Sequence, residues 1–167
     1  MNQALFLDRD GVINIDFGYV HKISECHFRP EIFKVMQAAM LKKFFIIIVT
    51  NQSGIGRGYY NHQDFKILDT YIYNEFRKRG ITVLQTYYCP FHPTYGIGHY
   101  RKTSWCRKPS PGMLVEACNK YNINPRFSLM IGDKKSDQSA AFCTGISRYI
   151  DANAKDWHND AIQNLYF

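Results

Sequence analysis

The sequence predicts an α/β fold in which a central parallel sheet lies between two layers of helices, a Rossmann-like three-layer α/β/α sandwich. Short apolar runs alternate along the chain with segments whose apolar residues recur at helical spacing, the pattern of a parallel sheet with crossover helices. Three of the apolar runs end abruptly in polar residues, as buried parallel strands do. No repeat or linker divides the 167 residues, so we expect a single domain over 1–167 with no inserted cap domain.

The first half of the chain alternates strands and helices. Residues 4–7 are an apolar run that ends at Asp8, and an irregular segment over 16–29 follows. Pro30 suits the first turn of a helix whose apolar positions continue to residue 40. Residues 44–49 form the second strand, and residues 50–58, which are polar and rich in glycine, form a loop. The next helix runs from residue 65 to the basic turn at 77–79, where Gly80 ends it.

The second half begins with an alternating strand over 81–88 and a long irregular loop over 89–109, a length that usually serves function. A helix over 110–121 precedes a strand over 128–131, and a helix and a short strand near 148–150 complete the pattern. Ligands of open parallel sheets bind beyond the carboxyl ends of the strands. Because Asp8, Thr50 and Asp133 follow three of these ends, we expect the functional site there.

Composition excludes several classes of protein. With 46% hydrophobic and 16% aromatic residues, most of the chain is expected to fold. The longest apolar run, 44–49, is too short to cross a bilayer, and the first residues lack the basic and apolar stretches of a secretory signal. The five cysteines are an odd number at irregular spacing, which indicates free thiols in a reducing compartment. We therefore expect a cytoplasmic protein with no membrane partner.

The formal net charge of +7 admits nucleic acid, acidic membranes or phosphorylated small molecules as partners. The basic turn at 77–79 suits a helix C-terminus, where cations are favoured. The tyrosine pairs at 59–60 and 87–88 occur without a nucleic-acid-binding motif. We expect a phosphorylated small molecule as the ligand, no nucleic acid, and a monomer.

Four acidic residues indicate a metal site. Asp8 and Asp10 are separated by one residue, and two carboxylates this close need a cation or a proton between them. Asp133 and Asp137 add carboxylates at another strand end, and Mg²⁺ prefers such oxygen ligands together with water and phosphate. Taken separately, each pair is as typical of a solvated turn or a helix N-cap.

Three further residues suit a phosphoryl group. Thr50 carries a hydroxyl and Asn51 an amide, and both can hydrogen-bond phosphoryl oxygens beside the backbone amides of a glycine-containing loop. Lys108 precedes Pro109, which fixes the backbone and with it the position of the ammonium group. The alternatives are a simple turn at 50–51 and a solvated surface position for the lysine.

In this order these groups resemble the four motifs of the haloacid dehalogenase (HAD) superfamily of phosphotransferases. The motifs are an Asp-x-Asp, a Thr or Ser, a Lys, and a pair of acids, matched here by Asp8 with Asp10, Thr50, Lys108, and Asp133 with Asp137. Longer segments at 7–14, 50–58, 89–93 and 106–114 resemble the D-glycero-D-manno-heptose-1,7-bisphosphate 7-phosphatases. The phosphatase domains that act on histidinol phosphate are close relatives with similar motifs. Both are compact and have no large cap domain.

The resemblance implies a Mg²⁺-dependent phosphatase that removes the 7-phosphate of the heptose bisphosphate through an aspartyl-phosphate, in the synthesis of nucleotide-activated heptose for a surface glycan such as lipopolysaccharide. It implies Asp8 as nucleophile, Asp10 as general acid and base, and Thr50 and Lys108 as groups that stabilise the phosphoryl oxygens. The implied metal ligands are Asp8, the backbone carbonyl of Asp10, and Asp133, with Asp137 in support. The residues implied to surround the substrate are Asp16, Phe17, Gly18, Tyr19, Asn51, Gln52, Ser53, Arg107 and Lys134, with Arg107 suited to a second phosphate.

The same family carries a structural zinc site, and here the sequence departs from it. Phe91 stands where a histidine is expected and Ser104 replaces a cysteine, so only Cys89 and Cys106 are retained. His92 or His99 could substitute, but His92 is one residue out of phase. A closed zinc site needs four ligands, so we expect zinc to be absent and apolar packing to hold a degenerate zinc loop over 89–109.

Several alternatives stay open. The substrate could be histidinol phosphate or another small phosphate ester, and the sequence does not distinguish the anomers of the heptose bisphosphate. From another class, the chain could be a non-catalytic phospho-ligand-binding protein with the same fold. The C-terminal residues 164–167 either resemble part of a protease-cleavage tag or are native.

Overall fold

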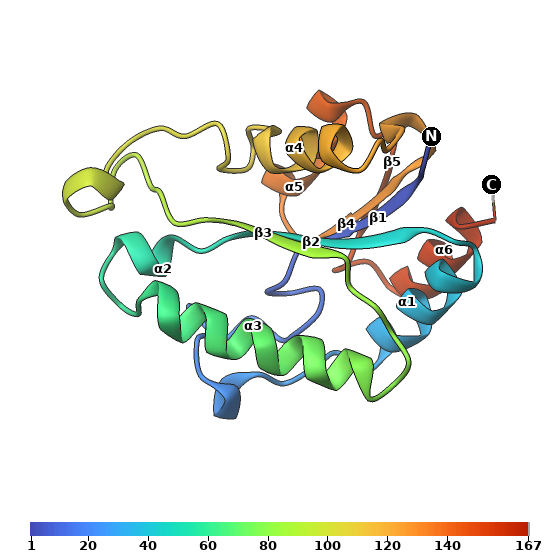
Figure 1. Cartoon of the computed structure of the whole chain (residues 1–167), viewed down its shortest axis with the longest axis horizontal. Helices are drawn as coiled ribbons and strands as arrows, with labels where there is room; N and C mark the ends of the chain where they lie inside the picture. Colours follow the sequence, from blue (N-terminus) through green and yellow to red (C-terminus); the bar gives the residue numbers. More distant parts are fainter. Residues whose placement is uncertain (167) are drawn as a thin grey trace.

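The computed structural model describes residues 1–166 and contains one sheet of five parallel strands in the order β3-β2-β1-β4-β5 (Figure 1). The strands are β1 (Ala4–Leu7), β2 (Phe45–Asn51), β3 (Gln85–Cys89), β4 (Leu129–Gly132) and β5 (Arg148–Asp151). The helices are α1 (Glu31–Leu41), α2 (Ser53–Gly56), α3 (His62–Arg77), α4 (Gly112–Lys120), α5 (Lys135–Thr144) and α6 (Trp157–Asn164). The predicted α/β fold class is confirmed, and the expectation of a single domain stays a prediction.

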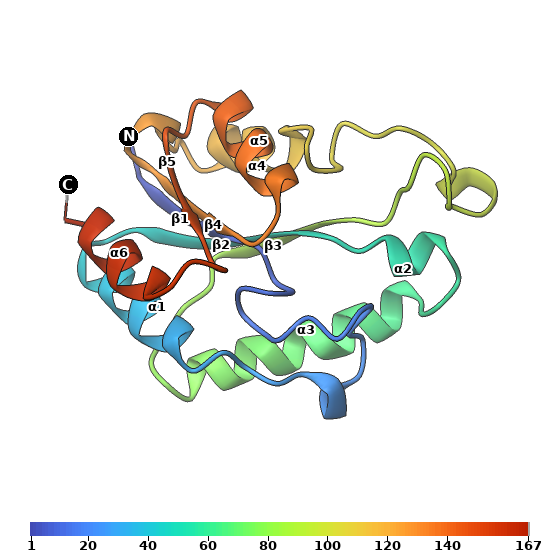
Figure 2. The same ribbon diagram turned by 180° about the vertical axis from the view of Figure 1, so that it is seen from behind.

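Helices cover both faces of the sheet: α1, α3 and α6 lie on one face, and α4 and α5 on the other (Figures 1 and 2). Side chains of β1 alternate between the two layers, so that Leu5 and Leu7 belong to one core and Ala4 and Phe6 to the other. Because both faces are covered, all of β1 is buried. This burial explains why the strand is a continuous apolar run.

The central position of β1 determines where the site forms. Leu7 aligns with Ile48 of β2 on one side and with Ile131 of β4 on the other. The residues that follow these three strands therefore meet at one edge of the sheet, where the strand order changes direction.

One strand and one helix begin several residues away from the positions expected from the sequence. The strand expected over 81–88 begins only at Gln85, because pairing with β2 starts there, opposite Ile47. The helix expected from residue 65 begins at His62, because the Asn61 side chain accepts hydrogen bonds from two backbone N–H groups of the first turn.

Two helices were not expected. The loop predicted over 50–58 contains the short helix α2. The chain after β5 forms α6. Its buried residues Trp157 and Ala161, with Leu165 just past its end, recur at helical spacing and join the core beside α1.

Within residues 1–166, no helix combines the length and the apolar character that a membrane crossing requires. Of the segment 164–167, which resembles a cleavage tag, only Phe167 lies outside the described residues. Leu165 of this segment is buried.

Candidate active site

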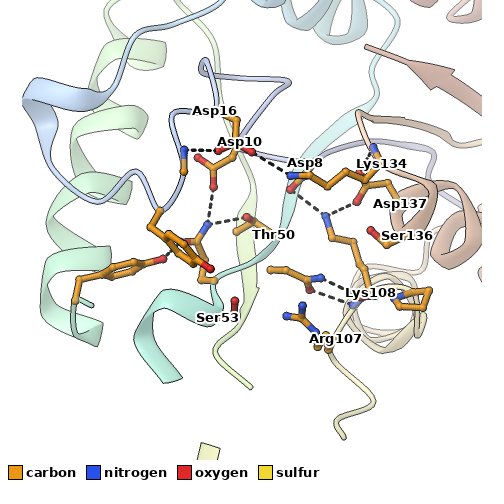
Figure 3. Close-up of a pocket in the computed structure, with 16 residues that line it drawn as sticks. Asp8, Asp10, Asp16, Thr50, Ser53, Arg107, Lys108, Lys134, Ser136 and Asp137 are labelled. Atoms are coloured by element: carbon orange, nitrogen blue, oxygen red, sulfur yellow. Dashed lines mark hydrogen bonds and ion pairs between the residues drawn. The ribbon is translucent and has the colours of Figure 1, made fainter. Parts of the chain in front are cut away.

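A cavity of about 560 Å³ lies beyond the carboxyl ends of β1, β2 and β4 (Figure 3). Its size suits a small molecule. Almost all residues assigned to catalysis, metal or substrate from the sequence line its walls; Phe17 and Asp133 do not. The structure leaves the Phe17 ring 62% exposed and packs it edge-on against His27 instead.

Three carboxylates converge at the end of β1. Oxygen atoms of Asp8, Asp133 and Asp137 all lie within 4.8 Å of one another, the only such group of metal-ligand side chains among residues 1–166. Asp8 follows β1, Asp133 follows β4, and Asp137 lies in the first turn of α5. Burial raises the pKa of Asp8, although the Lys108 ammonium opposes this rise, and burial raises the pKa of Asp133 to about 6.

The donor set at this point fits a divalent cation with oxygen ligands. Oδ1 of Asp133 is buried and has no hydrogen-bond partner within the described part of the chain. Gly11 makes room for this carboxylate: a Cβ at residue 11 would lie 2.3 Å from Oδ2 of Asp133, and the glycine has a φ of +88°. The side chain of Asp10 is not part of this group.

Asp137 and Lys108 fix the carboxylates relative to one another. Asp137 accepts hydrogen bonds from the backbone N–H groups of Asp133 and Lys134, at 3.2 and 3.1 Å, which holds the end of β4. The Lys108 ammonium is buried and lies 2.9 Å from Oδ1 of Asp8, 2.7 Å from Oδ1 of Asp137 and 2.7 Å from the carbonyl oxygen of Val49. These two carboxylates raise the pKa of Lys108 despite its burial, so the lysine is a fixed cation beside Asp8.

Asn51 positions the backbone that carries Lys108. Its Nδ2 donates to the carbonyl oxygen of Lys108 at 2.9 Å, and its Oδ1 accepts from the backbone N–H of Lys108 at 3.1 Å. Asn51 thus links β2 to the loop before α4, 57 residues further along the chain.

The Asp10 carboxylate is held by three neighbours. Arg9 contacts both of its oxygens through Nη2, at 3.0 and 2.9 Å, and Asn14 donates to Oδ1 at 3.0 Å. Gln52 donates to Oδ2 at 3.0 Å. The Arg9 side chain is 1% exposed and also donates to the carbonyl oxygen of Val20. The sequence analysis gave no role to Arg9, Asn14 or Tyr60. Only Arg9 could have been found from the sequence, because it lies between two acidic residues at the end of a buried strand.

The mouth of the cavity is more exposed than its floor. Lys134 bridges the loop after β1 and the end of β4, with its Nζ 3.1 Å from Asp16 and 3.6 Å from Asp133. Arg107 donates to the carbonyl oxygen of Phe91 at 3.2 Å and lines the opposite wall. No carboxylate of the described chain forms an ion pair with Arg107, so this guanidinium is available to an anionic ligand.

The retained thiols of the zinc-loop region lie together behind this wall. The Sγ atoms of Cys89 and Cys106 are 2.7 Å apart, and the Ser104 hydroxyl is 3.1 Å from Cys106. His92 instead accepts backbone hydrogen bonds within its own turn. Within residues 1–166 no third histidine, cysteine or acidic side chain joins the thiols, and the expectation that zinc is absent stays a prediction.

Arg29 supports the floor of the site from outside the cavity. Its Nη1 donates to the carbonyl oxygen of Gly11 at 2.5 Å and to that of Ala152 at 3.0 Å. Its guanidinium lies 5.0 Å from the centre of the Trp157 ring of α6, a cation–π distance.

Comparisons with known proteins place this fold and site in a known class. The family model described as HAD-hydrolase-like matches residues 105–150. A HAD-like phosphatase from Mesorhizobium loti has a similar structure, with a TM-score of 0.92, 29% sequence identity, and coverage of 98% of this chain and 86% of that one. The heptose bisphosphate phosphatase of B. bronchiseptica, solved with magnesium and phosphate, shares the fold with a TM-score of 0.81 at 21% identity, over 98% of each chain. The chain is a HAD-type phosphatase, an enzyme that hydrolyses phosphate monoesters.

Sequence relatives narrow this class. The chain is 45% identical over 145 residues to the D-glycero-alpha-D-manno-heptose-1,7-bisphosphate 7-phosphatase of Burkholderia mallei, covering 87% of this chain and 77% of that protein. It is 43% identical over 140 residues to the beta-anomer enzyme of Pasteurella multocida, covering 84% and 76%. The chain belongs to the family of D-glycero-D-manno-heptose-1,7-bisphosphate 7-phosphatases.

Proposed function

We propose that this enzyme removes the 7-phosphate of D-glycero-D-manno-heptose 1,7-bisphosphate and uses Mg²⁺. The observation that carries the proposal is the buried Asp8 carboxylate in the cavity, paired with Lys108 and grouped with two further carboxylates. Relatives at this level of identity, which are named for this substrate, support it. We place the enzyme, as a cytoplasmic monomer, in the synthesis of nucleotide-activated heptose for a surface glycan.

Asp8 is the nucleophile in this proposal, and Asp10 transfers protons. An oxygen of Asp8 bonds to phosphorus as the bond from phosphorus to the sugar oxygen breaks. The Asp10 carboxyl gives its proton to the departing sugar oxygen. A water oxygen then attacks phosphorus, its proton passes to Asp10, and the bond from Asp8 to phosphorus breaks to release inorganic phosphate. Both reactions need Asp10 close to the cavity, and its side chain, 15% exposed, lines the wall.

The remaining residues supply charge and position. Lys108 and Thr50 stabilise the phosphoryl oxygens, and Asn51 keeps the lysine in place. Asp8, the backbone carbonyl of Asp10, and Asp133 would hold Mg²⁺, with Asp137 in support. When bound, the ion neutralises phosphoryl charge and orients the ester. Arg107 and Lys134 would bind the rest of the sugar bisphosphate, with Arg107 facing the second phosphate.

A phosphatase screen tests this function. Purified protein is assayed with Mg²⁺ on both anomers of the heptose bisphosphate, on histidinol phosphate and on hexose phosphates, with Asp8→Asn as the control. We expect fast release of one phosphate from a heptose bisphosphate and no release by the variant. Faster turnover of histidinol phosphate would transfer the assignment to that substrate. Feeble rates on every ester, unchanged by Asp8→Asn, would support a non-catalytic binding protein.

A further inference from the structure

We propose that Gln52 is a positioning residue that sets the orientation of the Asp10 carboxyl and the Thr50 hydroxyl and does not bind substrate. This inference rests on the proposed role of Asp10 as proton donor. The resemblance assigned Gln52 to the substrate, but its side chain is 1% exposed, and its Nε2 and Oε1 atoms both hydrogen-bond to protein groups.

The amide of Gln52 lies between two groups of the reaction. Its Nε2 carries two hydrogens, of which one is donated to Oδ2 of Asp10 at 3.0 Å and the other to Oγ1 of Thr50 at 2.9 Å. Because the Thr50 oxygen accepts from Gln52, its own hydrogen is free to point toward a phosphoryl oxygen in the cavity. One amide thus prepares both the proton donor and a phosphoryl-binding hydroxyl.

Tyr60 fixes which way the amide points. Its hydroxyl donates to Oε1 of Gln52 at 2.5 Å. Burial raises the pKa of Tyr60, so the phenol keeps its proton and remains a donor. The ring stacks on His21, with centroids 4.9 Å apart and planes within 2°. A Cβ at Gly54 would lie 2.2 Å from the Tyr60 ring, so the loop that carries Gln52 packs directly on this ring.

Arg9 restrains the other side of Asp10. It contacts both carboxylate oxygens, and Asn14 donates to Oδ1. Without Gln52, the carboxyl keeps the Arg9 contact but loses the side-chain amide that holds Oδ2 on the cavity side. The expected defect is therefore a misplaced proton donor in an intact fold.

The test compares two leaving groups. An alkyl oxygen needs a proton from Asp10 as it departs, whereas p-nitrophenolate leaves without one, so in the first step, ester cleavage, a misplaced donor slows the alkyl ester far more. Hydrolysis of the aspartyl-phosphate is the same for both esters, so the first step is measured separately, in a single turnover. Gln52→Met keeps the length of the side chain and removes its amide. We expect the single-turnover rate of ester cleavage to fall about 10²-fold on the sugar phosphate and much less on p-nitrophenyl phosphate, with KM nearly unchanged on both. Tyr60→Phe should cause a smaller loss with the same selectivity.

Gln163→Met, at an exposed position of α6, is the matched control and should change neither rate. A rise in KM with kcat preserved would overturn the inference, because it identifies Gln52 as a substrate contact. Equal losses of the single-turnover cleavage rate on both esters would also overturn it. If the wild type rejects the heptose bisphosphate but hydrolyses another alkyl phosphate, the proposed substrate is wrong, and the same comparison is made with that ester.

Discussion

Replacing Lys108 by methionine is the most informative single perturbation of the site. Methionine keeps most of the apolar stem and removes the ammonium that lies between Asp8 and Asp137. Lys108 is 2% exposed, so solvent does not take over its role. Two buried carboxylates would then face each other with no cation from the chain between them.

The size of the effect follows from this geometry. Oxygens of Asp8 and Asp137 lie within 4.8 Å, and two unit charges at that distance repel by roughly 3.5 kcal/mol at an effective dielectric constant of about 20. Removing one partner of a buried ion pair typically costs about 3–5 kcal/mol. We therefore expect Lys108→Met to lower the free energy of unfolding by about 3–5 kcal/mol and kcat by about 10²–10³-fold.

Urea unfolding followed by circular dichroism, with EDTA to exclude divalent ions, measures the stability change. Lys66→Met, at an exposed position of α3, is the control and should stay within about 0.5 kcal/mol of the wild type. Burial raises the folded-state pKa of Asp8, so its charge costs stability above that pKa, and this cost disappears as the pH falls. The loss caused by Lys108→Met should thus shrink as the pH falls below neutral. A variant within about 1 kcal/mol of the wild type at neutral pH would refute this account of the site.

Three further outcomes are expected. Gly11→Ala should lower the free energy of unfolding by about 1–3 kcal/mol, because residue 11 has a positive φ. The new methyl group should also displace Asp133 and so weaken Mg²⁺ binding measured by calorimetry. A variant that binds Mg²⁺ with wild-type affinity would contradict the close packing of Gly11 against Asp133. The hydrogen bond with the Cys89 thiol lowers the pKa of Cys106 to about 6. At neutral pH, iodoacetamide should therefore alkylate Cys106 faster than the exposed Cys143, and the rate at Cys106 should decrease below about pH 6. Peptide mass spectrometry reports the order, and faster labelling of Cys143 would contradict the shift. Asn51→Leu removes both hydrogen bonds to the backbone of Lys108. It should lower kcat by the same factor on p-nitrophenyl phosphate and on the sugar phosphate. A loss of kcat on the sugar phosphate alone would indicate that Asn51 contacts substrate instead.

The sheet and the acidic group were predictable because their determinants are local. A strand buried on both faces must be continuously apolar, so the point where polarity begins, at Asp8 or Asp133, marks its carboxyl end. Parallel pairing then brings these ends to one edge of the sheet. The start of the strand at Gln85 was not predictable in the same way, because it depends on the register with β2.

The supports of the site were hidden because they depend on partners distant in the chain or on burial. Arg9 follows a strand end and would ordinarily be exposed; its burial depends on Asp10 and on the Val20 carbonyl. The amide of Asn51 could hydrogen-bond either a phosphoryl group or the protein backbone. Only the structure shows that it binds the backbone of Lys108, 57 residues further along the chain. Local sequence identifies a polar group at the site, and tertiary contacts decide whether it faces ligand or protein.

Arg29 makes the packing of α6 a determinant of catalytic geometry. Its guanidinium rests on Trp157 and holds the Gly11 carbonyl, and Gly11 in turn packs against Asp133. The path from a peripheral helix to a carboxylate of the acidic group thus consists of one side chain and one peptide unit. Variants that alter the enzyme should therefore also arise far from the cavity, at the contact between α6 and this arginine, where a search restricted to the cavity walls would miss them.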